Sequence, residues 1–335
     1  MRAIVYEGFG SPEILRCQDV EKPVPGENEV LVKVRAASVN PLDWKLMKGG
    51  PFLVRVLMGL GKPKIRRPGV DVAGVAEEIG RNVTELKPGD EVFGTCVGAF
   101  AEYATSASAF GLKSVLVKKP ANVSFEQAAS VPVAALTALQ GLRDKGRIQP
   151  GQKVLINGAS GGVGTFAVQI AKLFSAHVTG VCSTSNVDMV RSIGADRVID
   201  YTQNDFTRNG EHYDIVLDCV GNHSLSACRS VLNPHGRLVL VGAPDRAATV
   251  ITRTIGALLW SWFIPKKMVF FIARMNKEDL TAVGEFIAAG KVTPVIDRRY
   301  RLSESSEAFR YVEKGHVRGK VVITLEPGFE TAAPL

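Results

Sequence analysis

Apolar residues in the first third of the chain alternate with polar ones, and Gly and Pro separate the runs. Strand-like runs lie at residues 3–9, 29–39, 69–80, 89–95 and 100–106, with no long amphipathic helix among them. Alternation with a period of two, broken by turn residues, is typical of half-buried β-strands. The pattern therefore predicts a mainly β region over about the first 120 residues.

From about Ser124 the pattern changes to helical spacing, and then strands alternate with helices. Apolar strands are predicted at 153–158, 177–183, 197–201, 213–221 and 237–243, followed by a helix at 277–290, a strand at 294–300, a helix near 304–314 and a strand at 319–326. Strands that are apolar throughout and alternate with helices are typical of a parallel sheet covered on both faces. The middle of the chain is therefore predicted to be an α/β region.

Composition and charge narrow the class of protein. At roughly 150 residues per domain, 335 residues allow one large domain or two ordinary ones, and we favour two. Hydrophobic residues make up 46% and charged residues 22%, which argues against disorder. The net charge is +8, but the basic residues are scattered rather than clustered with aromatic ones, so a nucleic-acid partner is not indicated.

The five cysteines are widely spaced and contain no Cys-x-x-Cys, so neither a disulfide framework nor a zinc ribbon is predicted. Reduced thiols fit a cytoplasmic location. The first residues lack a basic region followed by an apolar stretch, so no secretion signal is expected. The most apolar segment, residues 255–264, has about half of the roughly 20 residues that a membrane-spanning helix needs, and no membrane span is predicted.

A longer apolar stretch, residues 255–272, carries two tryptophans and three phenylalanines and is too apolar for an ordinary surface helix. Three destinations are open: packing against a neighbouring domain, the wall or lid of a pocket for a hydrophobic substrate, and contact with a membrane surface or a second subunit. Basic residues on both sides of the stretch keep the membrane surface among them.

A glycine-rich turn joins the strand at 153–158 to a helix. It reads Gly158-Ala159-Ser160-Gly161-Gly162-Val163-Gly164. Glycines let the backbone approach a pyrophosphate, and the N-terminus of the following helix offers unpaired N–H groups and partial positive charge. The spacing departs from G-x-G-x-x-G, so the strand–turn–helix context carries the prediction, and a tight turn without a ligand is the alternative. We predict a dinucleotide site formed by Gly158, Ser160, Gly161, Gly162, Val163 and Gly164.

The end of the next strand indicates which dinucleotide binds. An acidic residue there would bind the ribose 2′-hydroxyl of NAD, but the chain has Ser183, Thr184, Ser185 and Asn186, and no carboxylate before Asp188. Because the hydroxyls of Ser183 and Ser185 can hydrogen-bond a 2′-phosphate, we predict NADPH over NADH. A helix cap is the alternative role for both serines.

Eight motifs stand in a characteristic order along the chain: residues 38–45 (SVNPLDWK), 68–74 (PGVDVAG), 87–94 (KPGDEVFG), 98–103 (GAFAEY), 136–138 (LTA), the glycine turn, 194–201 (GADRVIDY) and 319–322 (GKVV). In this order they resemble the medium-chain dehydrogenase/reductase superfamily, on its zinc-independent, quinone-oxidoreductase-like branch. The resemblance covers nearly the whole chain.

The resemblance implies a two-domain fold, an α/β Rossmann domain plus a GroES-like, mainly β domain. We place the GroES-like substrate and catalytic domain at residues 1–122 and 266–335, and the dinucleotide-binding domain at residues 123–265. The resemblance also implies an active site in the cleft between the domains and, by analogy with relatives, a homodimer.

Zinc-dependent members of the superfamily hold their catalytic metal through a Cys in the segment matching Asn40 and a His in the segment matching Val70, and this chain has neither. Its five histidines are dispersed, and none precedes His177, so no His/Cys cluster with ligand spacing exists. Without a Lewis acid, hydride transfer to an ordinary ketone loses several kcal/mol of charge stabilisation. A quinone or conjugated enone instead delocalises the charge onto an oxygen that hydrogen-bond donors stabilise. We therefore predict zinc-independent, NADPH-dependent reduction of small, hydrophobic quinones or α,β-unsaturated carbonyl compounds.

The resemblance also implies roles for individual residues near the nicotinamide. Asn40 would orient the substrate or the ribose, Asp43 would order polar neighbours, Lys45 would act electrostatically or in a proton relay, and Thr137 would lie beside the nicotinamide ring. The alternatives are structural: Asn40 and Pro41 form a loop bend, and Asp43 caps a short helix.

Three further residues are candidates for contacts with the cofactor. Tyr201 resembles the family's aromatic neighbour of the adenosine 2′-phosphate, although many relatives also have a basic residue where this chain has Ser185. Val220 and Gly242 follow later strands at their carboxyl ends, where open α/β sheets bind ligands. The geometry of a strand end is the alternative explanation of Gly242.

Two other functions fit the same fold. The first is an NADPH-binding sensor or partner-binding protein without productive turnover. The second is an enoyl-thioester reductase that acts on polyketide or fatty-acyl intermediates.

Overall fold

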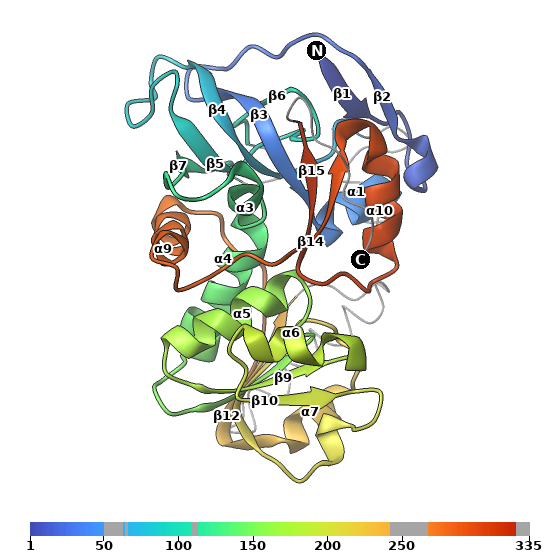
Figure 1. Cartoon of the computed structure of the whole chain (residues 1–335), viewed down its shortest axis with the longest axis vertical. Coiled ribbons are helices and arrows are strands. Elements are labelled where there is room, and N and C mark those ends of the chain that lie inside the picture. Colours follow the sequence, from blue (N-terminus) through green and yellow to red (C-terminus); the bar gives the residue numbers. More distant parts are fainter. Residues whose placement is uncertain (50–62, 64–65, 109–112, 242–266, 326–335) are drawn as a thin grey trace. The chain divides into compact units, whose positions relative to one another are not determined.

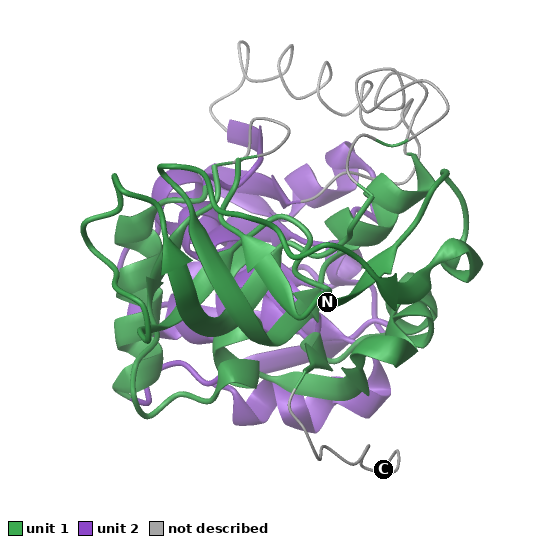
Figure 2. Ribbon diagram, turned by 90° about the horizontal axis from the view of Figure 1, so that it is seen from above, with its two compact units in different colours: residues 1–133, 275–289, 294–335 green, residues 134–274, 290–293 purple. Residues whose placement is uncertain are grey.

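The computed structural model describes residues 1–49, 63, 66–108, 113–241 and 267–325, which form two compact units (Figures 1 and 2). Unit 1 comprises residues 1–133, 275–289 and 294–335, and unit 2 comprises residues 134–274 and 290–293. Unit 1 continues past the predicted boundary at residue 122 because helix α3 (Phe125–Ala129) packs against its strands β3 and β4. The predicted boundary at residue 265 lies outside the described residues, but unit 2 continues to residue 274, because Lys267–Phe271 form a strand of its sheet.

Unit 1 is built around a mostly antiparallel sheet with the strand order β14-β15-β3-β4-β5-β7, in which β6 also pairs with β3 and only β14 and β15 are parallel to each other. The strands are β3 (Val30–Val39), β4 (Asp71–Ile79), β5 (Glu91–Thr95), β6 (Tyr103–Thr105), β7 (Leu116–Lys118), β14 (Ile296–Arg301) and β15 (Lys320–Thr324). Strands β1 (Arg2–Val5) and β2 (Arg16–Asp19) form a separate antiparallel pair. The mainly β region predicted from the alternating pattern is confirmed.

The helices of unit 1 are α1 (Pro41–Lys48), α3, α9 (Lys277–Ala288) and α10 (Ser305–Glu313), with 3₁₀ turns η1 (Pro12–Ile14) and η5 (Leu302–Glu304). Helices pack on the strands of this unit: α3 contacts β3, β4 and β5, α10 contacts β14, β15 and β3, and α9 contacts β7. Apolar side chains from β3, β4 and β15 meet those of α10, and Phe100 packs edge-to-face on Phe309 with ring centroids 5.7 Å apart. This core fixes the ends of β3, β4 and β15, where the polar residues described below lie.

Unit 2 is a six-stranded, fully parallel sheet with the order β10-β9-β8-β11-β12-β13. Its strands are β8 (Lys153–Asn157), β9 (His177–Cys182), β10 (Arg197–Asp200), β11 (Tyr213–Asp218), β12 (Leu232–Val241) and β13 (Lys267–Phe271). Its helical segments are most of α4 (Pro132–Gln140), a π-helical segment η2 (Gly141–Gly146), α5 (Gly162–Leu173), η3 (Thr184–Asn186), α6 (Val187–Ser192), η4 (Phe206–Arg208) and α7 (Leu225–Ser230).

The order of the strands places a switch point in the middle of this sheet. The chain runs from β8 outward to β9 and β10, and then returns to the other side of β8 with β11, β12 and β13. In open α/β sheets of this kind, ligands bind beyond the carboxyl ends of the strands at the switch point. For unit 2 this is the space after β8 and β11, and the predicted Rossmann arrangement is confirmed.

Of the apolar stretch 255–272, the structure describes only the last part. Lys267–Phe271 form the edge strand β13, in which Met268 and Phe271 are buried against the rest of unit 2, while Ile272 is 74% exposed. For these residues, the structure shows none of the three predicted contacts; they pack instead within the sheet of their own unit. Residues 255–266 and Gly242 lie outside the described residues. No helix in the described ranges is long and apolar enough to cross a membrane.

Candidate functional site

The glycine turn of unit 2 follows β8 at the switch point, and two of its glycines are required by the fold. Gly158 has a φ of +85°, and a Cβ there would lie 2.6 Å from Val220 Cγ2. A Cβ at Gly164 would lie 2.0 Å from the Gly158 carbonyl oxygen and 2.8 Å from Ala159 Cα. Neither position can therefore hold a side chain without displacing backbone or a neighbouring loop.

Gly161 is different, because the described residues leave room for a side chain there. Its φ and ψ of −83° and 178° suit any residue, and the one atom within 4 Å of a Cβ would be the Gly158 oxygen, at 3.4 Å. Gly161 is also the N-cap of α5, so no side chain caps the N–H groups of the first turn, which contains Gly162, Val163 and Gly164. An open position beside an uncapped helix N-terminus fits the close approach of a phosphate group.

A network of side chains ties the loop after β11 to the end of β8. Asn157 donates from Nδ2 to Asp218 Oδ1 at 2.9 Å and to Asn222 Oδ1 at 2.8 Å. Asp218 Oδ1 also accepts from the backbone N–H groups of Val220, at 3.2 Å, and Gly221, at 2.8 Å. Because Asn157 and Asp218 are buried, this network fixes the loop beside the glycine turn and holds Val220 at its rim.

Hydroxyl groups gather where β9 ends. Asn186 donates from Nδ2 to Ser160 Oγ at 3.3 Å and to Ser183 Oγ at 3.1 Å, and Ser183 Oγ lies 3.4 Å from Ser185 Oγ. Ser183 is the N-cap residue of η3 but makes no side-chain cap bond, so capping does not account for its hydroxyl. Asn186 Oδ1 is buried and has no hydrogen-bond partner among the described residues. A buried acceptor without a partner is costly, which fits a site completed by a ligand.

A carboxylate that sequence reasoning missed lies at the same edge. Asp200 ends β10 directly beside Cys182 of β9, and it accepts hydrogen bonds from the hydroxyls of Thr184, at 2.5 Å, and Thr202, at 2.8 Å. These bonds hold the pKa of Asp200 below its usual value, so the group is ionised at neutral pH. The sequence prediction considered only the second strand, whereas this acidic group comes from the third.

The residues of unit 2 fit a dinucleotide. Among the described residues, Tyr201 and Val220 are two of four large apolar side chains that remain exposed, at 50% and 54%, and both come from loops at the carboxyl end of the parallel sheet. Thr137 is half-buried on α4. The structure thus brings the predicted Gly158, Ser160, Gly161, Ser183, Ser185, Tyr201 and Val220 to one edge of the sheet.

Unit 1 contains a buried polar cluster at the ends of β3, β4 and β15, formed by Ser38, Asn40, Asp43, Asp71 and Lys320, which we call the Asp71–Lys320 cluster. Each of these residues is at most 3% exposed. Lys320 Nζ donates to Asn40 Oδ1 at 2.6 Å and lies 3.5 Å from Asp71 Oδ2. Asp71 Oδ2 accepts from Asn40 Nδ2 at 2.9 Å and from Ser38 Oγ at 3.0 Å. Asp43 joins the cluster by accepting from the Asn40 backbone N–H at 2.8 Å.

Burial dominates the electrostatics of this cluster. It raises the pKa of Asp43 to about 7, and the negative charge of Asp71 contributes in the same direction. Burial also raises the pKa of Asp71 and lowers the pKa of Lys320, while the attraction between these two groups opposes both shifts. The cluster therefore has a group that changes charge near neutral pH.

This geometry bears on the three predicted catalytic residues. Both ends of the Asn40 amide are engaged by Lys320 and Asp71, so this side chain is held within the cluster rather than free to turn. The structural alternative for Asp43 is confirmed, because its hydrogen bond to the Asn40 N–H caps α1. Lys45 lies on the same helix with Nζ 5.5 Å from the ring centroid of Trp44. The catalytic roles of these residues remain predictions.

Sequence reasoning missed the roles of Asp71 and Lys320, although both lie in motifs that carry the family resemblance. The signal was a charged residue within an otherwise apolar strand, in GVDVAGVA and in KVVIT. Charged residues are rarely buried unless they are paired, so two charges of opposite sign in apolar strands point to a buried pair.

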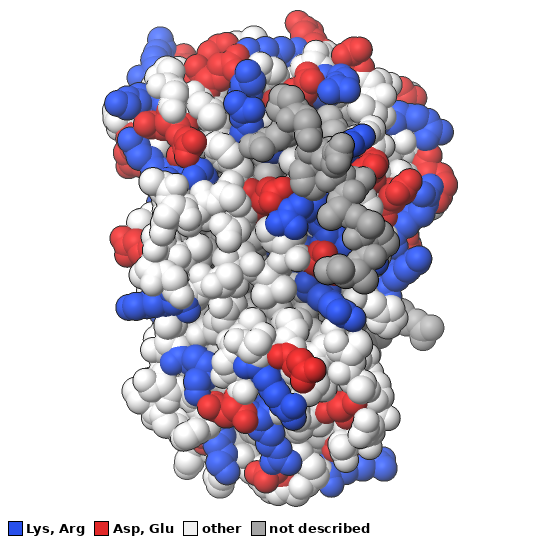
Figure 3. Space-filling model, in the orientation of Figure 1, with Lys and Arg blue, Asp and Glu red and all other residues white. Residues whose placement is uncertain are grey.

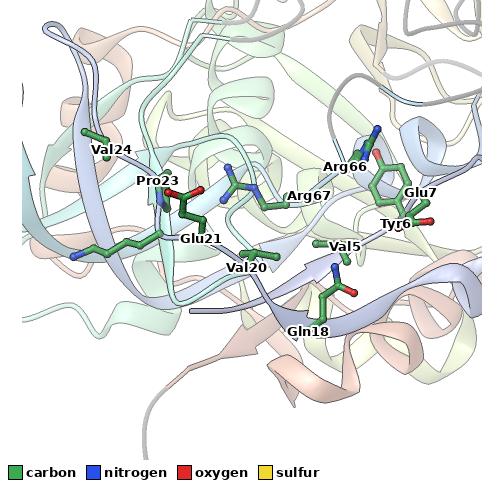
Figure 4. Close-up of a pocket in the computed structure, with 11 residues that line it drawn as sticks. Val5, Tyr6, Glu7, Gln18, Val20, Glu21, Pro23, Val24, Arg66 and Arg67 are labelled. Carbon is green, nitrogen blue, oxygen red and sulfur yellow. The ribbon is translucent and has the colours of Figure 1, made fainter.

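Unit 1 also has a surface hollow of about 520 Å³ beside β1 and β2 (Figure 4). Tyr6 and Arg66 lie together at one side of it, and Arg67 lies near Glu21 at the other. Burial and the charge of Asp43 raise the pKa of Tyr6 to about 12, so its phenol stays neutral. On the face drawn in Figure 3, Lys and Arg lie interspersed with Asp and Glu, in line with the scattered charges of the sequence. The described residues contain no group of three or more His, Cys, Asp and Glu that could hold a metal ion.

Comparison with known proteins identifies the family. Residues 26–140 match the alcohol dehydrogenase GroES-like domain, and residues 193–323 match the family described as zinc-binding dehydrogenase. The chloroplastic quinone-oxidoreductase QR1 of Triphysaria versicolor is 35% identical, over 96% of this chain and 98% of its own length. The chain belongs to the medium-chain dehydrogenase/reductase superfamily, among its quinone-oxidoreductase-like members. The predicted family and the predicted Rossmann and GroES-like fold class are confirmed.

Other members of the superfamily match over most of their length. The chloroplastic NADPH-dependent alkenal/one oxidoreductase of Arabidopsis thaliana is 31% identical over 96% of this chain and 79% of its own. The structure of the quinone oxidoreductase from Coxiella burnetii superposes with a TM-score of 0.85 at 31% identity, covering 97% of this chain and 99% of that one. Membership in this superfamily makes the chain an oxidoreductase.

Proposed function

We propose that this protein is a zinc-independent, NADPH-dependent reductase that transfers a hydride to quinones or α,β-unsaturated carbonyl compounds. The broader statement, that it is an NAD(P)H-dependent oxidoreductase, follows from its family. The observation that carries the proposal is the open Gly161 position, which lies beside the uncapped N-terminus of α5 at the switch point of a parallel sheet.

In this proposal, unit 2 holds the cofactor with its own residues. The N–H groups of the first turn of α5 bind the pyrophosphate, and Val220 and Tyr201 cover apolar parts of the ligand. The chemistry that a bound reduced nicotinamide supplies is a hydride. Asn157 and Asp218 hold the loop after β11 beside the glycine turn.

The preference for NADPH rests on the hydroxyl groups at the end of β9. The hydroxyls of Ser183 and Ser185 lie 3.4 Å apart at the end of β9 and can donate to a 2′-phosphate, and no side-chain cap bond occupies Ser183. Asp200 disfavours NADPH, because an ionised carboxylate repels a phosphate. Its oxygens, however, already accept hydrogen bonds from the hydroxyls of Thr184 and Thr202. The ratio of kcat/KM for NADPH to that for NADH tests this part, and a ratio below one contradicts it.

The substrate class follows from the need for an electrophile that accepts a hydride without a Lewis acid to stabilise the negative charge that develops on its oxygen. By the family resemblance, zinc-dependent relatives have a Cys ligand in the segment matching Asn40 and a His ligand in the segment matching Val70, and this chain has neither residue there. Hydride addition to an enone produces an enolate, which takes one proton to give the saturated carbonyl; a quinone takes one hydride and one proton to give the hydroquinone. The names of the quinone and alkenal/one oxidoreductases among the relatives support this class.

A substrate panel tests the proposal. The purified protein, treated with a metal chelator, is mixed with NADPH and with a quinone, a conjugated enone, the matching saturated ketone or an enoyl thioester. We expect NADPH consumption with the first two and little with the third. Binding of NADPH without consumption in any mixture supports the sensor alternative, and faster turnover with enoyl thioesters than with free enones supports the enoyl-reductase alternative.

Two other features are part of the proposal. We infer a homodimer by analogy with the family, and β13, at the edge of the described sheet, is a strand that could pair with a second copy. The cytoplasmic location inferred from the cysteine pattern remains a prediction. Equilibrium sedimentation tests the first, and a purely monomeric protein contradicts it.

A further inference from the structure

The Asp71–Lys320 cluster contains three ionisable groups that are almost fully buried. Asp43 on α1, Asp71 on β4 and Lys320 on β15 are each at most 3% exposed. The register of the sheet brings them together: Val321 lies opposite Val39, so Lys320 comes beside Asn40, and Ser38 lies opposite Asp71. Asn40 links all three, since its amide binds Lys320 and Asp71 and its backbone N–H binds Asp43.

The charges in this cluster do not balance when every group is ionised. Two carboxylates and one ammonium leave one negative charge without a partner, and an unpaired buried charge costs several kcal/mol. A single proton on one carboxylate makes the cluster neutral. Neutrality therefore favours one carboxylic acid and one carboxylate beside the ammonium.

The hydrogen bonds decide which carboxylate keeps the proton. Asp71 is contacted by Lys320 and also accepts from Asn40, Ser38 and the Val133 backbone N–H at 3.1 Å. Asp43 accepts from two backbone N–H groups, those of Asn40 and Gly69. Because more donors and the one cation stabilise the anion of Asp71, the proton belongs on Asp43.

We propose that Asp71 and Lys320 are positioning residues of this enzyme, which together fix the Asn40 amide and hold one exchangeable proton on Asp43, so that the charge of this cluster sets the pH range in which the enzyme works. The last part rests on the proposed function, because it requires turnover. Lys320 and Asp71 act in opposite directions: the cation favours ionised Asp43, and the carboxylate disfavours it.

Other charged groups around α1 do not belong to the buried set of charges formed by Asp43, Asp71 and Lys320. Tyr6, which follows β1, has a neutral phenol near Asp43. Lys45 and Lys48 are on α1 itself, and Lys48 forms an ion pair with Glu313 of α10 at the more exposed side of the helix. Arg66 and Arg67 precede β4 and line the surface hollow. None of these is among the charges that shift the pKa of Asp43 most, which are those of Asp71 and Lys320.

The experiment is a titration of the full chain without cofactor or substrate. Aspartate labelled with ¹³C at the side-chain carboxyl is followed by NMR, and the resonance of Asp43 is assigned by its loss in Asp43→Asn. We expect a group that titrates near pH 7. Lys320→Met raises its pKa and Asp71→Asn lowers it, each by about one unit or more. Lys320→Arg, which keeps the charge, leaves the pKa close to that of the wild type.

A matched control separates charge from loss of packing. Lys119 is also buried in unit 1, with its side chain 4% exposed and its Nζ paired with Glu91 at 3.0 Å. Lys119→Met removes a buried lysine outside the cluster and leaves the pKa of Asp43 unchanged. If Lys320→Met does not fold, Asp71→Asn and Lys320→Arg still decide the direction of the effect.

Three results overturn the proposal: an Asp43 that titrates near the ordinary aspartate value, shifts of the same sign in Lys320→Met and Asp71→Asn, or an equal shift in Lys119→Met. The pH profile of kcat/KM is then recorded for the wild type and Asp71→Asn. We expect the limb of the profile that reports the titration of Asp43 to shift by the same amount as the NMR pKa. A limb that stays in place while the NMR pKa moves removes the link to turnover. Because the titration needs no turnover, it still tests the proton on Asp43 if the reductase assay fails.

Discussion

Replacing Gly161 with alanine separates what the fold requires from what the cofactor requires. The backbone at Gly161 is in an ordinary extended conformation, and a Cβ would meet only the Gly158 oxygen, at a normal contact distance of 3.4 Å, among the described residues. Folding stability should therefore stay the same or rise by about 0.4–1 kcal/mol, because alanine restricts the unfolded chain. In the bound state, the methyl group occupies the space that a pyrophosphate needs.

The expected loss of cofactor affinity is at least tenfold, which corresponds to about 1.4 kcal/mol. Isothermal titration with NADPH measures the affinity, and urea unfolding without cofactor measures the stability. Gly164→Ala is the matched comparison: its Cβ would lie 2.0 Å from a backbone oxygen, so we expect it to lose about 1–3 kcal/mol of stability as well as binding. If Gly161→Ala folds like the wild type and binds NADPH equally well, the cofactor does not approach the turn as we infer.

Side-chain replacements elsewhere in the two units should have equally specific effects. Replacing Ser183 and Ser185 with alanine should lower kcat/KM for NADPH more than for NADH, and an equal loss for both cofactors contradicts the role of the hydroxyls. Asp43 has a pKa of 3.8 in the unfolded chain and about 7 in the folded protein, so between these pH values the folded protein binds one more proton. The free energy of unfolding should therefore fall by about 1.4 kcal/mol for each pH unit of increase across this range. Urea unfolding at pH 5, 6 and 7 measures this slope, which Asp43→Asn should lack. Asp218→Ala should cost about 1–3 kcal/mol and raise KM for the cofactor, because it leaves the N–H groups of Val220 and Gly221 without their acceptor; unchanged values would show that the loop is held by other contacts.

Much of unit 2 could be predicted from the sequence because local chemistry determines it. The turn after β8 needs glycine at residues 158 and 164 for reasons that any strand–turn–helix unit shares, and the apolar strands of a covered parallel sheet are easily recognised. The hydrogen bond between Asn157 and Asp218 could not be predicted, because it depends on the pairing of β11 with β8. The same holds for Asp200, which lies beside the end of β9 only because β10 pairs in that register.

The Asp71–Lys320 cluster of unit 1 shows more clearly that contacts set by strand pairing cannot be predicted from the sequence. Asn40 and Asp43 belong to one short motif and can be found from it. Asp71 and Lys320 are 249 residues apart in the chain, and they meet because β15 and β4 both pair with β3. Their buried position also adds to the interpretation of Asn40, whose amide is held on both sides by this pair. Sequence patterns identify such residues as unusual, but the register decides what they contact.

The most direct test of the proposed reaction is the transfer of isotope from the cofactor. NADPH deuterated at the transferable C4 position is incubated with the chelator-treated protein and a conjugated enone, and the product is examined by NMR. We expect one deuterium at the β-carbon of a saturated carbonyl product. Deuterium at the carbonyl carbon of an allylic alcohol, or no transfer at all from a cofactor that binds, would contradict the proposed hydride transfer.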